Sequence, residues 1–143
     1  MSFVDAKIAL EKRLKDSWTR TPIRWPNQPF VVPEDTLHNP QPYVAFVLRN
    51  TGGEDIVLGS DSPEWRWTGV VILQIFVPEN SGTAVLTLYA DLIKTIYLQA
   101  PRDFQYQNSG IIRLYVPAVQ EIGINNGWMQ ANVVVPFKRD AKQ

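Results

Sequence analysis

Two segments of the chain place hydrophobic residues at the spacing of an amphipathic helix. From residue 3 to residue 18 the apolar positions recur at steps of three and four, with lysine, glutamate and aspartate between them. From residue 85 to about residue 98 a second apolar stripe follows the same period. Asn80 or Ser81, in the PENSG segment before this stripe, is the expected N-cap of the second helix.

The segments between and after these helices have the composition of β-strands. One strand is expected at YVAFVLRN (43–50) and a longer one at WRWTGVVILQIFV (65–77), with a short candidate strand at 56–58. The segment IIRLYVPAV predicts a strand that Pro117 interrupts or ends. The segment EIGINNGWMQANVVVPF predicts a hairpin that turns at Asn126-Gly127.

This order of elements predicts one α+β domain over residues 1–143. A chain of 143 residues is the size of one ordinary domain. Strands grouped on each side of a single helix favour a two-layer sandwich. We therefore expect a mostly antiparallel sheet of four to five strands, with the two main helices on one face.

The predicted strands are apolar on both sides, so the second face of the sheet also needs a cover. In the 65–77 strand, Leu73 and Ile75 fall on one side, while Ile72 and Phe76 fall on the other. Two helices on one face leave the other bare, and a bare apolar face of this size exceeds what soluble monomers usually expose. Either another subunit or the proline-rich arm of the chain is expected to lie across it. The apolar residues of that arm are Ile23, Trp25, Phe30 and Val31.

Two irregular segments stand out by composition. Residues 19–42 hold six of the eleven prolines, which lack an amide donor and hold the preceding residue in an extended geometry, so this segment is expected to be an extended arm. Residues 51–64 are rich in turn-forming residues and form an expected acidic loop. Its carboxylates, with no basic residue among them, are Glu54, Asp55, Asp61 and Glu64.

Charge and cysteine content exclude several classes of protein. Fourteen basic residues balance fourteen acidic ones, so the chain lacks the net charge of a general nucleic-acid binder. No cysteine is present, which excludes disulfides and thiolate metal sites. The first residues resemble neither a secretion signal nor a membrane span, so we expect a protein made in the cytoplasm without a membrane partner.

The sequence offers no convincing catalytic, cofactor or metal site. His38 is the single histidine, so neither a histidine cluster nor a serine triad has enough partners. The GGED segment at 52–55 is read as a solvated hairpin tip, since no phosphate or metal motif accompanies it. The five tryptophans are read as core or interface anchors, because no basic cluster accompanies them for stacking on nucleic acid. We expect no enzymatic activity and no cofactor.

The arm and its neighbours carry a pattern with a known relative. WTRTPIRWPNQPF directly follows the first helix, PYVAFVLR opens a strand, and WRWTGVVILQIFVPENSGTAVLTLYADLIKTIY joins a strand to the second helix. Together these segments resemble the tail terminator, or tail completion, proteins of long-tailed double-stranded DNA phages, over residues 6 to 137. The positions that match the arm pattern, interpreted as structural anchors, are Pro22, Trp25, Pro26, Asn27 and Phe30.

The resemblance implies a structural role in the virion. Such a subunit forms a ring, expected to be a homohexamer, at the head-proximal end of the tail tube after assembly in the host cytoplasm. The ring stops tube polymerisation and provides the interface for head-tail joining. Its implied partners are itself, the major tail tube protein and the head-tail connector protein, with room for DNA to pass but no specific nucleic-acid binding.

Two alternatives stay open, and one surface is a candidate interface. The alternatives are another head-tail connector component and a small-molecule-binding or isomerase-like α+β domain. The acidic loop could dock on the tail tube or on a basic segment of the next subunit, where complementary charge sets register and encounter rate. The candidate interface residues are Glu54, Asp55, Asp61, Glu64, Arg66 and Arg113.

Overall fold

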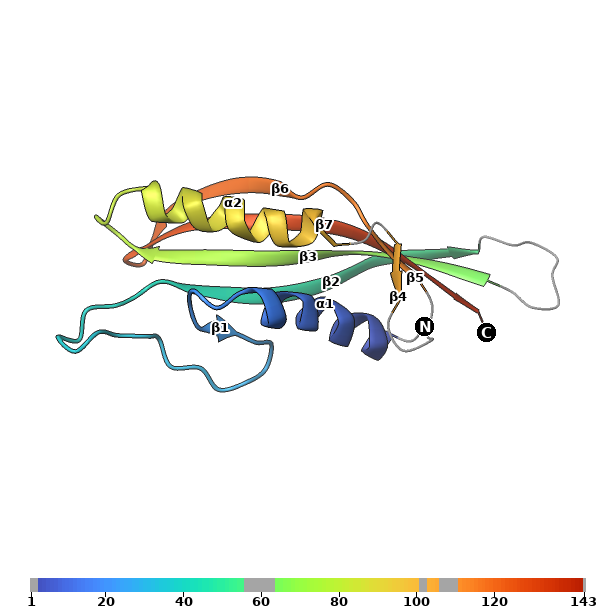
Figure 1. Ribbon diagram of the computed structural model, residues 1–143, viewed down its shortest axis with the longest axis horizontal. Coiled ribbons are helices and arrows are strands. Elements are labelled where there is room, and N and C mark those ends of the chain that lie inside the picture. Colours follow the sequence, from blue (N-terminus) through green and yellow to red (C-terminus); the bar gives the residue numbers. More distant parts are fainter. Residues whose placement is uncertain (1–2, 56–63, 101–102, 106–110, 143) are drawn as a thin grey trace.

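The computed structural model describes residues 3–55, 64–100, 103–105 and 111–142, which form one sheet with two helices (Figure 1). The helices are α1 (Phe3–Ser17) and α2 (Ala84–Leu98). The strands are β1 (Ile23–Arg24), β2 (Tyr43–Asp55), β3 (Glu64–Pro78), β4 (Asp103–Gln105), β5 (Ile111–Leu114), β6 (Ala118–Asn125) and β7 (Trp128–Lys142). The α+β class and both predicted helices are confirmed.

Within the described residues the sheet has seven strands in the order β1-β2-β3-β7-β5-β4, and β6 also pairs with β7. The pairs among β2, β3, β7 and β6 are all antiparallel, whereas β1 pairs with β2 in parallel. The prediction of four to five strands was therefore too low, and the sheet is mixed. The missed strands β1 and β4 have two and three residues, which is too short to produce a periodic pattern.

The β2–β3 hairpin is longer than predicted. β2 continues past Asn50 to Asp55, so residues 51–55 are strand and the predicted acidic loop of 51–64 was too long. A bulge between Asn50 and Gly52 shifts the register, after which Gly52 lies opposite Thr68 and Gly53 opposite Trp67. The GGED segment is thus part of a strand and not a hairpin tip. The candidate strand at 56–58 and Asp61 lie outside the described residues.

The β6–β7 turn agrees with the sequence prediction, whereas the N-cap of α2 does not. Asn126 and Gly127 have φ angles of 53° and 84°, which is the left-handed geometry of a two-residue turn, so the predicted β6–β7 hairpin is confirmed. The N-cap of α2 is Thr83, not Asn80 or Ser81. The Ser81 hydroxyl instead donates to the carbonyl of Pro78, within the turn that ends β3.

The core lies between the two helices and one face of the sheet. Every second residue of β3 from Val71 to Val77 is buried there, as are the matching positions of β7 from Ala131 to Phe137. α1 contributes Leu10 and Leu14, and α2 contributes Ile93. This surface of the sheet is called the helix face below. The opposite surface, which carries the alternate residues, is called the far face.

Three hydrogen bonds join α1 to α2 directly. The buried Tyr97 hydroxyl donates to the carbonyl of Leu10 over 3.2 Å. Arg13 donates from Nε and Nη2 to the carbonyl of Ile96, at 3.1 and 2.8 Å. Ile96 lies in the last turn of α2, where unpaired carbonyls and the helix dipole favour a cation. The helices are therefore held in register by polar contacts as well as by their apolar stripes.

The buried Tyr97 predicts that the folded protein loses stability at alkaline pH. Burial raises the pKa of the Tyr97 hydroxyl above its ordinary value of 10.0. The unfolded state therefore loses this proton at a lower pH than the folded state does. The contribution of Tyr97 to the free energy of unfolding is complete below pH 10 and declines as the pH rises toward the folded pKa. We expect the free energy of unfolding to fall more steeply above pH 10 for the wild type than for Tyr97→Phe. Urea unfolding of both proteins from pH 8 to pH 11.5 measures this, and parallel pH profiles would contradict it.

Candidate functional site

Neither helix packs on the far face, which spans four strands of the described sheet. One cross-strand row runs Val47, Ile72, Val134 and Ala118, in the strand order β2, β3, β7, β6. The next row carries small or amide side chains: Ala45, Gln74, Asn132 and Gln120. Most of these side chains are half-buried by their neighbours in the sheet, and both helices pack on the helix face. The far face is therefore a broad, weakly polar surface with few charges at its centre.

The arm does not cover this face. Ile23 and Trp25 pack against the core of the helix face, and Val31 is 88% exposed. Phe30 reaches the far face only at one end, where its ring lies 5.1 Å from that of Tyr43. Tyr43 in turn stacks on Phe76 at 4.7 Å. Figure 1 shows most of the arm extending away from the sheet. The alternative in which the arm covers the whole second face is therefore wrong.

The first half of the arm is fixed by prolines and one aromatic contact. The amide of Val44 donates to the carbonyl of Pro22, which starts the parallel pairing of β1 with β2. Donors on the paired side of β1 recur at every second residue, and Pro26 has no amide to continue the ladder. The half-buried Trp25 ring lies 5.6 Å from that of Phe46. Asn27 is exposed and turns the chain with a φ of 52°.

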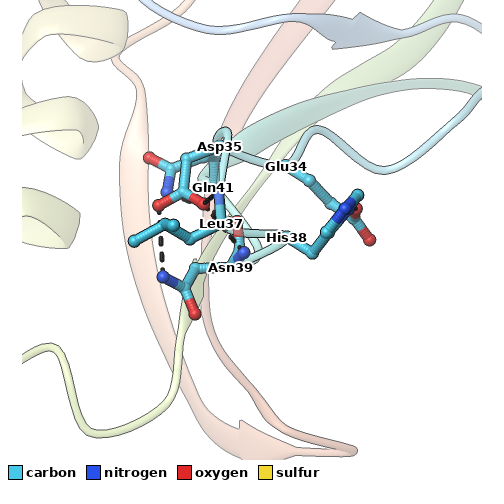
Figure 2. Close-up of polar contacts among 6 residues, drawn as sticks. All are labelled: Glu34, Asp35, Leu37, His38, Asn39 and Gln41. Atoms are coloured by element: carbon cyan, nitrogen blue, oxygen red, sulfur yellow. Dashed lines mark hydrogen bonds and ion pairs between the residues drawn. The ribbon is translucent and has the colours of Figure 1, made fainter.

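The tip of the arm is an ordered polar turn (Figure 2). Oδ1 of Asp35 accepts hydrogen bonds from the amides of Leu37 and Asn39, at 2.8 and 2.9 Å. The hydrogen bond from the Asn39 amide is the main reason that the pKa of Asp35 lies below its ordinary value. His38 is highly exposed, and its Nδ1 lies 3.1 Å from a carboxylate oxygen of Glu34. This geometry is that of a solvated turn.

No catalytic or metal centre is found in the part of the chain that the structure describes. There, no group of three or more histidine, cysteine, aspartate or glutamate side chains could hold a metal ion. Ser60 and Ser62, the two serines of the segment GSDS (59–62) that could be considered as nucleophiles, lie outside the described residues.

Most of the predicted interface residues lie where β2 ends and β3 begins. The register places Glu54 opposite Arg66, and Arg66 opposite Asp140. Arg66 donates from Nε and Nη2 to the two carboxylate oxygens of Asp140, at 2.9 and 3.2 Å. Such a two-pronged pair is the strongest geometry for arginine and carboxylate. The exposed Arg113 lies opposite Lys138 in the adjacent row.

The acidic members of this set are only partly described. Glu54 and Asp55 end β2, and Glu64 begins β3. Their backbone positions are described but their side chains are not, and Asp61 lies outside the described residues altogether. The strand register nevertheless brings Glu54 into the same row as Arg66 and Asp140, which connects the acidic segment with the arginine pair.

Comparison with known proteins assigns this architecture to a family. The phage tail terminator protein family matches residues 6–137. The chain belongs to the phage tail terminator family. One solved structure, which carries only a sequence identifier as its name, has a TM-score of 0.70 and 16% sequence identity, covering 97% of this chain and 96% of that chain. At that identity the similarity concerns the fold alone. No curated protein matches the chain.

Membership of the tail terminator family makes the protein a structural component of a phage tail. The predicted family resemblance is confirmed, and its residue range agrees with the match. The family is one of structural proteins rather than enzymes. No helix among the described residues of this family member is long and apolar enough to span a membrane.

The tail terminator chain also has a groove, but its lining does not resemble an enzyme pocket. The groove has a volume of about 710 Å³ and runs between the arm and the edge of β2. One wall is the arm segment 24–29, and the other is formed by residues 45–48 of β2 with Gln74. Arg24 is its one ionisable lining residue, so the groove lacks the convergent titratable groups of a catalytic site.

One charged residue of the fold was missed by the sequence analysis. Arg139 is buried on the helix face, and its guanidinium lies 5.5 Å from the ring centre of Trp67. Burial lowers the pKa of Arg139 from its ordinary value. The signal was present in the sequence, because Val133, Val135 and Phe137 alternate toward the core and Arg139 continues the same series. A cation–π contact with Trp67 accounts for the tolerance of a charge there.

Proposed function

We propose that this protein forms a closed ring, expected to be a hexamer, at the head-proximal end of the tail tube. The ring stops polymerisation of the tube and provides the interface for head-tail joining. It assembles in the host cytoplasm, and its partners are further copies of itself, the major tail tube protein and the head-tail connector protein. Membership of the tail terminator family supports this role in general terms.

The observation that carries the proposal is the uncovered far face. The far face spans β2, β3, β7 and β6, and neither helix nor the arm lies across its centre. The row of Val47, Ile72 and Val134 on this face is apolar, and apolar surface that continues over several strands is typical of an interaction site. Identical subunits that meet through two different patches form a ring when the rotation between them closes, and a ring can cap a tube of matching symmetry.

The direct test is the assembly state of the purified protein. We expect native mass spectrometry and negative-stain microscopy to detect closed rings, which become more abundant when tail tubes are added. Addition of the protein to growing tubes should also stop their elongation at normal length. A protein that stays monomeric at high concentration and leaves tube length unchanged would contradict the proposal and favour another connector component.

The acidic segment predicts a salt-sensitive association. Single exposed charge pairs contribute only about 0 to 1 kcal/mol, so a single substitution should have little effect. We expect simultaneous replacement of all four carboxylates by lysine to leave the monomer folded, to weaken ring or tube association, and to remove much of its salt dependence. The four residues are Glu54, Asp55, Asp61 and Glu64. Analytical ultracentrifugation at low and high salt measures the effect.

A second variant controls for the change in net charge. It replaces four exposed acidic residues outside the hairpin with lysine: Asp16, Glu34, Glu79 and Asp91. This variant should associate more strongly than the hairpin variant. If both associate equally, or if the hairpin variant restores a terminator-deficient phage to normal titre, the acidic segment has no docking role.

A further inference from the structure

The outer edge of β6 is an unprotected strand edge. β6 pairs with β7 on one side, and no strand in the described part of the chain pairs with its other side. Its aliphatic side chains are unusually exposed, with Ile122 at 50% and Ile124 at 65%. Soluble proteins usually protect such edges with lysine, proline or a covering loop. β6 contains no lysine and no proline, and Glu121 is its only charged residue.

A second open edge lies on the opposite side of the sheet, along β2. β1 pairs only with Val44 and Ala45, because Pro26 cannot continue the ladder. The Val44 amide points toward β1, so by alternation the Phe46 carbonyl and the backbone groups of Leu48 point toward the same side, beyond the last β1 pair, where no strand of the described residues pairs with them. The groove of about 710 Å³ borders this stretch, with Trp25, Pro26 and Pro29 on its outer wall.

The two edges have compatible directions. β2, β3, β7 and β6 are joined by successive antiparallel pairs, so β6 runs opposite to β2. When one copy follows another head to tail, the β6 of the first copy therefore lies antiparallel to the β2 of the next. Antiparallel addition of this kind preserves the two faces of the sheet, so the far faces of both copies stay on the same side.

The residues at the two edges are also complementary. β6 contributes the exposed aliphatic side chains Val119, Ile122 and Ile124. The groove beside β2 offers the rings of Trp25, Pro26 and Pro29 among the polar residues Arg24, Asn27, Gln28 and Gln74. Glu121 lies opposite Ala131, which places it on the helix face. On that side of the β2 edge, Trp25 lines a depression together with two acidic and two basic residues of α1: Glu11, Lys12, Lys15 and Asp16. Lys12 pairs with Asp16, so the match between the two edges rests on strand direction and on apolar side chains rather than on charge.

We propose that β6 of one copy pairs with the open edge of β2 in the next copy, and that this strand addition forms the contact between neighbouring subunits. The inference rests on the proposed ring, and it specifies which surfaces join. The occupant of the groove beside β2 is a second copy of this chain, and the groove is not a small-molecule site.

The first test places lysine on the β6 edge. The double variant Val119→Lys/Ile124→Lys introduces two charges on the strand edge that should enter the groove beside β2, and both positions are exposed in the monomer. We expect ring formation to fall at least tenfold, while circular dichroism and the melting temperature of the monomer stay unchanged. Thr87→Lys, at an exposed position of α2, is the matched control and should form rings normally.

The second test uses cross-linking of introduced cysteines. Because the chain has no cysteine of its own, only the introduced ones can react. Val119 and Leu48 both lie on the helix face of the sheet, as their register partners Val133 and Val71 show. β6 and β2 of one copy are three strand spacings apart, which is about 14 Å. A shorter bismaleimide should therefore link Val119→Cys/Leu48→Cys only between copies, and should give a ladder up to the full ring.

The outcomes separate this inference from the proposed function. Rings with a cross-linked ladder, lost in the lysine variant, support strand addition. Wild-type rings that persist in the lysine variant and give no ladder overturn it while the ring itself stands. Cross-linked dimers from Val119→Cys alone indicate twofold pairing of β6 with β6 and also overturn it. A wild type that never forms rings overturns the proposed function and this inference together.

Discussion

Replacement of Trp18 by alanine is expected to destabilise the protein by about 3 to 5 kcal/mol. The Trp18 side chain is only 4% exposed and lies just after α1, where the chain enters the arm. Its ring meets that of Tyr89 on α2 edge to face, with 5.2 Å between centres. Its Nε1 donates to the hydroxyl of Thr21 over 2.9 Å. One side chain thus connects both helices and the arm, and alanine would leave a large cavity between them. Urea unfolding measures the loss.

Trp25 provides the comparison for this prediction. The arm pattern marks Trp25 as a structural anchor, and a fully buried tryptophan at that position would cost about 3 to 5 kcal/mol on truncation to alanine. The structure places it half-buried beside Phe46. We therefore expect Trp25→Ala to cost only about 1 to 2 kcal/mol. A larger loss for Trp25→Ala than for Trp18→Ala would contradict the burial argument.

The elements that the sequence predicted correctly are those with many periodic residues. The two helices contain 15 residues each, and their apolar stripes match the residues that they bury, such as Leu10 and Ile93. The β6–β7 hairpin was predictable because Asn-Gly suits a turn with two positive φ angles. In these cases local chemistry and tertiary packing favour the same structure.

The features that were missed depend on contacts between distant segments. β1 exists because Pro22 and Ile23 meet β2 about twenty residues later, and nothing within two residues can predict that. Gly52 and Gly53 suggested a turn, but cross-strand partners hold them in β2. The candidate site was predicted in part: both faces of the sheet were expected to be apolar, but its open edges follow only from the strand order.

Gly69 shows how such a long-range contact can dominate a position, and it gives the second large predicted effect. Gly69 is buried in β3 opposite Phe137, a fully buried residue of β7. A Cβ atom added at Gly69 would lie 2.6 Å from Cζ of Phe137 and 2.7 Å from the carbonyl oxygen of Arg49. Both distances are far below van der Waals contact, and the second involves backbone in the bulged region of β2. The glycine is needed so that the Phe137 ring can lie across the strand.

We therefore expect Gly69→Ala to cost at least the 1 to 3 kcal/mol that is typical of an overpacked core, measured by urea unfolding at neutral pH. Gly52→Ala is the matched control in the neighbouring strand, since its added Cβ would lie 3.7 Å from Oγ1 of Thr68, an ordinary contact. That variant should change stability by less than about 1 kcal/mol, because a tolerated alanine also reduces the entropy of the unfolded chain. Gly53→Ala should behave like Gly69→Ala, because its Cβ would lie 2.5 Å from the Trp67 ring. Equal stability of the Gly52 and Gly69 variants would show that β3 shifts away from Phe137 at little cost. The close contact would then not be the reason that position 69 needs glycine.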